Sequence, residues 1–312
     1  TNVTAPLTVN AVYTSALRYY TVYFYNGSTL LQTVENVPYG GSATYTGATP
    51  VNPDDASLGF EGWSPSPTNI TGNTTCYAQF ESPVRGTITD TWAQIIAACS
   101  DGTYATKYHV GDTKEIKLGS EGTVCMQIVA FDADTRSDGN GTAHITWISE
   151  QLLKTSKRMN PSRAGSSGAY TEGTGSIGGW EKSEMRTYMK ETIKPLIPAE
   201  VRAAILEVTK TSYAYNTEGT AYQQTTQDDV WLPSTRDLAY SDKKETSGPM
   251  YSEMFPDLAS HKKYKVGSTS ATYWWLRSAG GSGNFCYVKS DSGDWSTDSA
   301  TISYGVALGF CT

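Results

Sequence analysis

Apolar and polar side chains alternate along much of the first 80 residues, and a period of two is typical of β-strands. Residues 20–25 alternate in this way, and Asn26-Gly27 then supplies the two-residue turn of a β-hairpin. The sequence PYGG at positions 38–41 interrupts the pattern. Further strands are predicted at residues 30–37, 43–45 and 74–80.

The rest of the chain mixes helical and strand periods. Apolar residues from Trp92 to Cys99 recur at i, i+3, i+4 and i+7, which predicts a short amphipathic helix. Pro198 suits the first position of another helix, whose apolar face would run to Val208. Besides this helix at 198–208, a helix is predicted at 181–192 and a helical turn at 148–154. A long polar loop is predicted at 155–180 and a capping box at 234–237. Strands are predicted at 124–131, 143–148, 230–232, 273–278 and 304–310.

An internal repeat organises the N-terminal part. Residues 1–15 match residues 68–82 at a constant offset of 67, sharing TN, a β-branched residue and Thr, then Thr, Ala, an aromatic residue and Ser. We therefore expect residues 1–16 to be the last strand of a preceding, truncated β repeat. Residues 17–82 would be one complete copy, and residues 83–312 a separate C-terminal ligand-binding domain.

The complete copy resembles the Listeria–Bacteroides, or internalin B-type, repeat. The matching stretches are YTVYFYNGSTLLQTV, PYGGSATY and FEGWSPSPTNITGNTTCYAQF, and the resemblance covers the whole of residues 17–82. Members of that family are small β-grasp-like spacers on bacterial surface proteins and phage tail proteins. The resemblance implies a stalk or adaptor, and the repeat is expected to space the C-terminal domain without binding a ligand itself.

The segment before the C-terminal strand has an unusual composition. Between Ala279 and Tyr304, ten of 26 residues are Gly or Ser and three are Asp, with Tyr287 and Trp295 among them. Small hydrogen-bonding residues with rigid aromatic side chains are typical of an antibody paratope. The plainer interpretation is a set of Gly/Ser-rich β-turns, and composition alone does not decide between the two. Ordered apolar residues at 273–276 and 304–310 would frame the segment and hold it outward.

Four motifs carry a second resemblance, which covers residues 87–312. GGWEKSEMRTYM, VWLPSTRDL, YWWLRSA and YGVAL, in that order, resemble the non-enzymatic branch of the formylglycine-generating-enzyme type of C-type-lectin-like proteins. The resemblance implies an α+β fold: a C-type-lectin-like domain with a few short helices, preceded by a small β-rich β-grasp-like repeat. It also identifies the domain as similar to the variable proteins of diversity-generating retroelements.

In the branch diversified by retroelements, variable positions lie just upstream of the C-terminal strand. The resemblance therefore places a ligand-binding surface within residues 280–303. The candidate exposed residues are Gly281, Ser282, Asn284, Tyr287, Ser290, Ser292, Asp294, Trp295, Thr297, Asp298, Ser299 and Thr301.

Charge and hydropathy exclude several classes of function. The net charge is −7 and no basic run is present, whereas nucleic-acid binding requires a cationic surface. No stretch of apolar residues is long enough for a transmembrane helix, so no membrane insertion is expected. The chain starts at Thr1, without an initiator Met or a signal peptide, and we expect it to be the C-terminal part of a longer protein.

Residues for catalysis are sparse, and no catalytic residue is predicted. The three histidines are His109, His144 and His261, and no GxSxG, P-loop or HExxH motif occurs. Oxidising enzymes of the resembled superfamily use a closely spaced cysteine pair, whereas Cys286 and Cys311 are 25 residues apart. The five cysteines are expected to be free, buried thiols, with Cys286–Cys311 the first pair to check for a bridge.

One loop of the sequence has side chains that could bind calcium. Asp132, Asp134, Asp138 and Asn140 form an oxygen-rich loop, but Arg136 occupies a ligand position of the EF-hand pattern and no Glu closes the loop. A solvated turn is therefore the favoured interpretation, and neither a metal nor another cofactor is predicted. The QPD and EPN tripeptides that mark sugar-binding, calcium-dependent lectins are also missing.

Together these features predict a non-enzymatic display protein that binds a protein or glycan receptor on a host cell surface. We expect it on a virion, as part of a phage tail, or on a bacterial cell surface. The alternative is a structural module that caps or oligomerises a fibre without contacting a receptor. A homo-oligomer formed through the stalk is compatible with either hypothesis.

Overall fold

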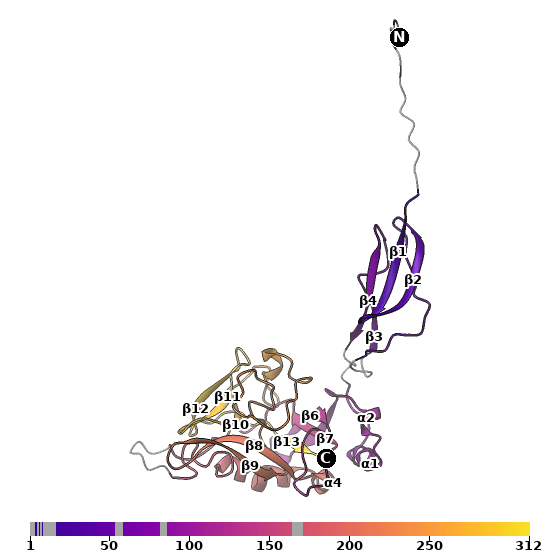
Figure 1. The fold of residues 1–312 in the computed structure, drawn as a ribbon. Coiled ribbons are helices and arrows are strands. Elements are labelled where there is room, and N and C mark those ends of the chain that lie inside the picture. The colour runs from indigo at the N-terminus through magenta and orange to yellow at the C-terminus, as the bar shows by residue number, and fades with distance from the viewer. Residues whose placement is uncertain are drawn as a thin grey trace. The chain divides into compact units, whose positions relative to one another are not determined.

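The computed structural model describes residues 17–53, 59–81, 86–163 and 171–312, together with the single residues 4, 6 and 8. Contacts between Cα atoms divide the chain into two units, Thr1–Val84 and Arg85–Thr312, and each is described by itself (Figure 1). The predicted last strand of a preceding repeat, at 1–16, lies almost wholly outside the described residues.

The first unit contains one four-stranded sheet in the order β2-β1-β4-β3. Its central strands β1 and β4 run parallel, and the outer strands pair antiparallel with them. Val22, Phe24 and Cys76 are fully buried on the sheet, and the ring of Phe24 meets that of Trp63 at 4.6 Å between centroids. The strands are β1 (Tyr19–Asn26), β2 (Thr29–Pro38), β3 (Gly59–Ser64) and β4 (Thr74–Glu81).

Three of the four strands predicted in this unit are confirmed, and one is wrong. Residues 43–45 form no strand, because their neighbourhood is held by other hydrogen bonds: the amide of Ala43 donates to the carbonyl of Pro67 at 2.9 Å, and that of Thr46 to the Gln32 side chain at 2.8 Å. Strand β3 was not predicted, because the glycines within and before FEGW hide its alternation.

The second unit is built from three small sheets (Figure 1). An antiparallel sheet has the order β13-β7-β6-β5, a second has the order β10-β11-β12, and β8 and β9 form a two-stranded ribbon. The strands are β5 (Thr113–Lys117), β6 (Thr123–Phe131), β7 (Ile145–Ser149), β8 (Val208–Tyr215), β9 (Ala221–Asp228), β10 (Trp274–Gly281), β11 (Asn284–Val288), β12 (Trp295–Ser299) and β13 (Gly309–Cys311).

The helical segments of this unit are short, and the longest has 10 residues. That helix, α1, is the one predicted from Trp92, and Thr91 begins it with a capping box to Gln94. The segments are α1 (Trp92–Asp101), α2 (Tyr104–Lys107), η1 (Gly119–Glu121), α3 (Glu184–Tyr188), the π-helical turn η2 (Met189–Ile193), η3 (Lys194–Leu196), α4 (Ala199–Ala204) and η4 (Leu258–His261).

The other helix and strand predictions were less accurate. The helix predicted at 181–192 is interrupted after five residues by the π-helical turn η2. The helix predicted at 198–208 ends at Ala204, because Ile205 takes an extended conformation. The helical turn predicted at 148–154 does not form. In the strand predicted at 230–232 only Trp231 makes a β-bridge. The strand predicted at 304–310 is mostly absent, because the strand here is β13 alone.

The predicted α+β fold class is wrong. The described residues are mostly β, arranged in several small sheets with four short α-helices. Two features explain the error. The helical patterns between 181 and 208 extend for fewer residues than their periodicity suggested, and the polar segment at 280–303, expected as an outward loop, forms β11 and β12.

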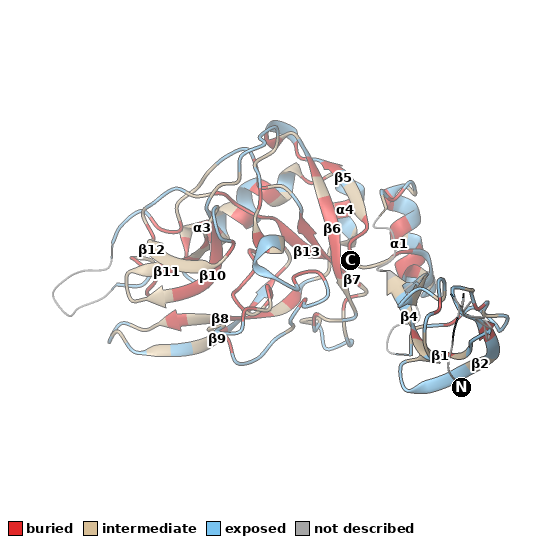
Figure 2. Cartoon of the chain, turned by 90° about the horizontal axis from the view of Figure 1, so that it is seen from above, coloured by how far each residue is buried: buried red, intermediate tan, exposed pale blue. Residues whose placement is uncertain are grey.

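One continuous apolar core joins the three sheets of the second unit. The side chains of Trp147, Trp180, Trp231, Trp274 and Trp275 are all fully buried within it. Figure 2 shows buried residues along β6 and β10, whereas all residues of β12 are partly exposed.

A buried ion pair connects two of the motifs noted in the sequence. Arg277, from YWWLRSA, and Asp237, from VWLPSTRDL, are each 1% exposed, and Arg277 Nη1 lies 2.5 Å from Asp237 Oδ2. The guanidinium also donates to the carbonyls of Leu232 at 2.7 Å and Thr211 at 3.0 Å. Burial would raise the pKa of Asp237, but the charges of Arg277 and Lys210 outweigh it and hold that pKa below its usual value.

Replacing Arg277 by Met should destabilise the second unit strongly. The change would leave the Asp237 carboxylate buried without its partner, which typically costs about 3–5 kcal/mol. The free energy of unfolding, measured by denaturant titration, reports the loss. As a control, Arg136→Met removes the exposed ion pair with Asp138 and should leave the unfolding midpoint nearly unchanged. Equal effects of the two substitutions would contradict the structural role given to Arg277.

Candidate ligand-binding surface

The sheet β10-β11-β12 contains most of the predicted binding segment. Directly paired residues of antiparallel strands point to the same face of a sheet. Tyr287 pairs with Trp275 on β10 and with Ser296 on β12, and Phe285 pairs with Asp298. Phe285, Tyr287, Ser296 and Asp298 therefore share one face, on which Phe285 is fully buried, while the intervening residues of each strand share the other.

Three tyrosine rings gather on that first face. The ring centroids of Tyr273 and Tyr287 are 5.3 Å apart, those of Tyr287 and Tyr304 5.0 Å, and those of Tyr273 and Tyr304 5.4 Å. The hydroxyl of Tyr304 donates to Asp298 Oδ2 at 2.6 Å. We call Tyr273, Tyr287, Asp298 and Tyr304 the tyrosine face.

A buried tryptophan on the same face of the sheet packs against two of the tyrosines. The ring of Trp275 is fully buried and lies 4.7 Å from that of Tyr304 and 6.2 Å from that of Tyr287. Its Nε1 donates to the carbonyl of Lys157 at 3.0 Å, and the backbones of Lys157 and Tyr304 also exchange hydrogen bonds. Tyr287 and Tyr304 therefore pack against a fixed side chain, and Tyr273 packs against both of them.

The tyrosine face is accessible, and the phenol of Tyr304 keeps its proton. Tyr273 is 37% exposed, and Tyr287, Asp298 and Tyr304 are partly exposed. Burial, together with the hydrogen bond to Asp298 and its charge, raises the pKa of the Tyr304 hydroxyl well above its usual value. The face thus combines apolar ring area, hydroxyl groups and one carboxylate.

The opposite face of the same sheet is occupied by the protein itself. Cys286 and Val288 are buried there. Trp295, which pairs with Val288, donates from Nε1 to Asp242 Oδ1 at 2.8 Å. Thr297 packs so closely on Gly280 that a Cβ at position 280 would overlap its methyl group. Trp295 and Thr297 are therefore held by neighbouring residues and present less area to a partner than the sequence suggested.

The twelve predicted site residues do not form one patch. Tyr287 and Asp298 belong to the tyrosine face, whereas Asn284, Trp295, Thr297 and Ser299 point to the opposite face. Gly281 and Ser282 lie at the turn between β10 and β11, Ser290, Ser292 and Asp294 at the turn between β11 and β12, and Thr301 follows β12. Only Ser292 is fully exposed, the other eleven are partly exposed, and none is buried.

Sequence reasoning missed Tyr273 and Tyr304 as surface residues. Both were assigned to the apolar frame around the segment, yet they complete the tyrosine face. A signal was present: each stands at the N-terminal end of its apolar run, where a tyrosine can turn its hydroxyl toward solvent. Spacing alone could not show that the two ends of the frame meet around Tyr287.

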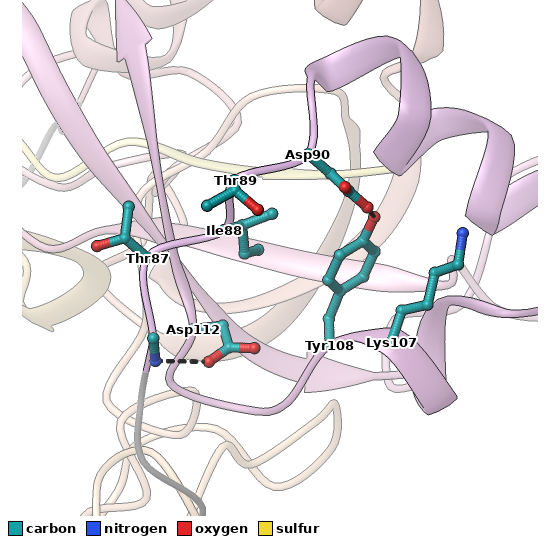
Figure 3. Close-up of a pocket in the computed structure, with 8 residues that line it drawn as sticks. Thr87, Ile88, Thr89, Asp90, Lys107, Tyr108 and Asp112 are labelled. Atoms are coloured by element: carbon teal, nitrogen blue, oxygen red, sulfur yellow. Dashed lines mark hydrogen bonds between the residues drawn. The ribbon is translucent and has the colours of Figure 1, made fainter.

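The cavities of the second unit contain polar groups that are already bonded to one another. Figure 3 shows a cavity of about 430 Å³ lined by residues 86–90, Lys107, Tyr108 and Asp112. Tyr108 donates to Asp90 at 2.8 Å, and Asp112 accepts from the backbone amides of Gly86 at 2.8 Å and His109 at 2.9 Å. These carboxylates anchor the chain around the cavity.

Two histidines line other cavities. His261, in η4, borders a cavity of about 420 Å³, and His144, just before β7, borders one of about 220 Å³ that also touches Cys99. Burial lowers the pKa of His261, and its Nδ1 lies 3.2 Å from the carbonyl of Gly293. Burial raises the pKa of the Cys99 thiol, which disfavours the reactive thiolate.

The oxygen-rich loop at 132–140 uses its carboxylates within the protein. Asp132 accepts from Tyr104, Asp134 is paired with Lys210, and Asp138 is paired with Arg136. Among the residues that the structure describes, no group of three or more His, Cys, Asp or Glu side chains is arranged to hold a metal ion.

The thiols and the helices give two further findings. All five cysteines are free, and no bridge joins Cys286 to Cys311. Four of the thiols are buried as predicted, whereas Cys125 is partly exposed. Within the described ranges, every helix is too short or too polar to cross a membrane.

Comparison with known proteins yields one match. Residues 150–311 match the model of a family described as a domain of unknown function, DUF6273. This region covers more than half of the 312 residues and includes the tyrosine face. No curated protein matches the chain, and no solved structure matches it, so the C-type-lectin-like fold expected from the resemblance gains no support there.

Gly293 should tolerate no side chain, although it lies within the segment predicted to vary. Its φ is +77°, and a Cβ there would overlap the carbonyl oxygen of Leu258. Gly293→Ala should therefore lower the free energy of unfolding by more than about 1 kcal/mol. The neighbouring Ser292→Ala, at an exposed position, should change it by less than about 0.5 kcal/mol. Thermal and denaturant unfolding of both variants checks this, and equal stability would show that the turn adapts.

Proposed function

We propose that this chain, which belongs to the DUF6273 family, is a non-enzymatic binding protein whose tyrosine face contacts a protein or glycan receptor. In this proposal the second unit displays the face, and the first unit spaces it from a phage tail or a bacterial surface. The observation that carries the proposal is the cluster of Tyr273, Tyr287 and Tyr304 on one side of the β10-β11-β12 sheet.

Tyrosine suits such a surface for a physical reason. Its ring offers a large contact area with only two side-chain torsions to order, and its hydroxyl can donate or accept a hydrogen bond. Here the rings already contact one another and Trp275, so little side-chain entropy remains to be lost on binding. A standard interface buries about 800 Å² on each partner, so the tyrosine face would be its centre and the adjoining turns its rim.

The polar groups of the cavities favour binding over catalysis. A general base must be free to accept a proton from a substrate. The carboxylates in Figure 3 accept hydrogen bonds from Tyr108 and from backbone amides instead. His261 is buried, and its pKa is lowered by that burial. That the protein has no enzymatic activity is nevertheless part of what we propose.

The alternative is a module that caps or oligomerises a fibre. In that case the tyrosine face would be covered by a second copy of the chain, and no external receptor would bind it. Sedimentation of the purified chain separates the two hypotheses, because a covered face requires a stable oligomer that dissociates when Tyr287 is replaced.

Replacing tyrosines of the face should weaken receptor binding without unfolding the protein. The fluorescently labelled chain is tested against a panel of bacterial cells and immobilised bacterial surface polysaccharides. Tyr273→Ala and Tyr287→Ala should each weaken binding to any recognised member of the panel roughly tenfold or more, as expected for central contacts. The matched control is Tyr222→Ala on β9, because Tyr222 is 38% exposed and Tyr273 is 37% exposed.

Two results would contradict the proposal. One is equal loss of binding in the Tyr222 control and in the two face variants, which would indicate nonspecific adhesion by exposed rings. The other is unchanged binding by folded Tyr273 and Tyr287 variants, which would place the receptor contact elsewhere.

A further inference from the structure

A lysine and an aspartate meet in the interior of the second unit, far from solvent. Lys210 lies on β8 and Asp134 lies in the loop after β6, and both side chains are 0% exposed. Lys210 Nζ is 2.5 Å from Asp134 Oδ1. Neither residue belongs to the tyrosine face, and the proposed function makes no use of them.

The two oxygens of Asp134 have different partners. Oδ2 accepts hydrogen bonds from the hydroxyls of Tyr251 at 2.8 Å and Thr146 at 2.7 Å. Oδ1 faces Lys210 Nζ. The Tyr251 hydroxyl also lies 2.9 Å from Nζ, so it accepts from the lysine while it donates to Oδ2. Burial, followed by the charge of Asp134, raises the pKa of Tyr251 well above its usual value, so the hydroxyl keeps its proton.

Aromatic rings surround the pair and lower the local polarity. Lys210 Nζ lies 3.4 Å from the centroid of a ring of Trp231, and both Trp231 and Tyr251 are buried. Two opposite charges in such a medium each lose several kcal/mol of hydration, and only a part of that loss is recovered by their attraction. A neutral product would remove this penalty altogether.

We propose that Lys210 and Asp134 condense to an intramolecular isopeptide bond between Nζ and Cγ. The reacting groups are held in contact by the fold, and such confinement can replace an external activating reagent because it raises the effective concentration by many orders of magnitude. The two hydroxyls on Oδ2 stand where negative charge develops on the carbonyl oxygen during attack, so they act as an oxyanion hole.

The atoms and charges of the reaction balance without a redox partner. One proton moves from the ammonium to Oδ1, which gives a neutral amine and a carboxylic acid. The Nζ lone pair attacks Cγ, and the C–N bond forms while Oδ2 carries the negative charge. A second proton passes from nitrogen to Oδ1, the C–Oδ1 bond breaks, and one water molecule leaves. The amide keeps the last nitrogen-bound proton, and Oδ2 becomes its carbonyl oxygen, still bonded to Tyr251 and Thr146.

Other lysines of the unit supply matched controls. Lys263 is also buried, but its Nζ donates to the backbone carbonyl of Ser149 at 2.7 Å, a group that cannot condense with it. Lys157 lies 2.8 Å from Glu184, but both side chains are about 30% exposed, so water keeps the ions charged. Among the lysines that the structure describes, only Lys210 combines a carboxylate partner, full burial and hydroxyl donors on the other oxygen.

Mass spectrometry of the full chain tests whether the isopeptide bond forms. The denatured, purified protein should be lighter than its sequence by the mass of one water molecule, and Lys210→Met should restore the full mass. A tryptic digest should contain one branched peptide that joins the segments around Asp134 and Lys210, while Lys157, Glu184 and Lys263 appear in unbranched peptides. The digest of the wild-type chain is sufficient even if the Lys210 variant fails to fold.

The opposite result is equally clear. An unreduced intact mass, with Asp134 and Lys210 recovered in separate linear peptides, would show a noncovalent ion pair and overturn the proposal. A loss of water that maps to any other pair of residues would overturn it as well.

Discussion

The fold of the second unit depends on the requirement that a buried charge be paired. Arg277 is 1% exposed, and its guanidinium reaches Asp237, the carbonyls of Leu232 and Thr211, and the hydroxyl of Ser212. These groups come from β8 and from the loop after β9. Any rearrangement that leaves this arginine unpaired would strongly destabilise the protein, because its interior has a low dielectric constant. The side chain of Arg277 therefore fixes β10, β8 and the loop after β9 relative to one another.

The tyrosine face inherits its rigidity from this constraint. Arg277 and Trp275 lie on the same strand, and Trp275 is the residue on which Tyr287 and Tyr304 pack. Strand β10 is fixed by the Arg277–Asp237 ion pair and by the hydrogen bond from Trp275 to the carbonyl of Lys157. The tyrosine rings that pack against Trp275 therefore have little freedom to move. A surface ordered before its partner arrives loses less entropy on binding, which is the main physical reason for regarding these tyrosines as contacts rather than as loose surface residues.

Local sequence patterns predicted local structure, but they could not predict contacts between residues that are far apart in the sequence. Helix α1 was predictable because its apolar spacing and its cap lie within ten residues, and β1, β2, β4, β6 and β10 follow from alternation and apolar runs. The Arg277–Asp237 pair spans 40 residues and left no periodic signal. The candidate site was half predicted for the same reason. Composition marked 280–303, but the register that puts Tyr287 on one face and Trp295 on the other is a property of strand pairing, and a shift of one residue would exchange them.

The β10-β11-β12 sheet also separates positions that can change from positions that cannot. Gly280 and Gly293 have no room for a Cβ, and Cys286 and Val288 are buried, so these residues must stay small or apolar. Ser292 lies in a turn with its side chain in solvent, and Ser296 is partly exposed beside Tyr287 on the tyrosine face. If the binding surface varies among related proteins, the variation should therefore be confined on β11 to partly exposed positions such as Tyr287 and should be greater on β12, instead of filling the segment evenly. In a diversified segment that forms strands, the buried residues stay fixed and keep the core closed while the exposed ones change.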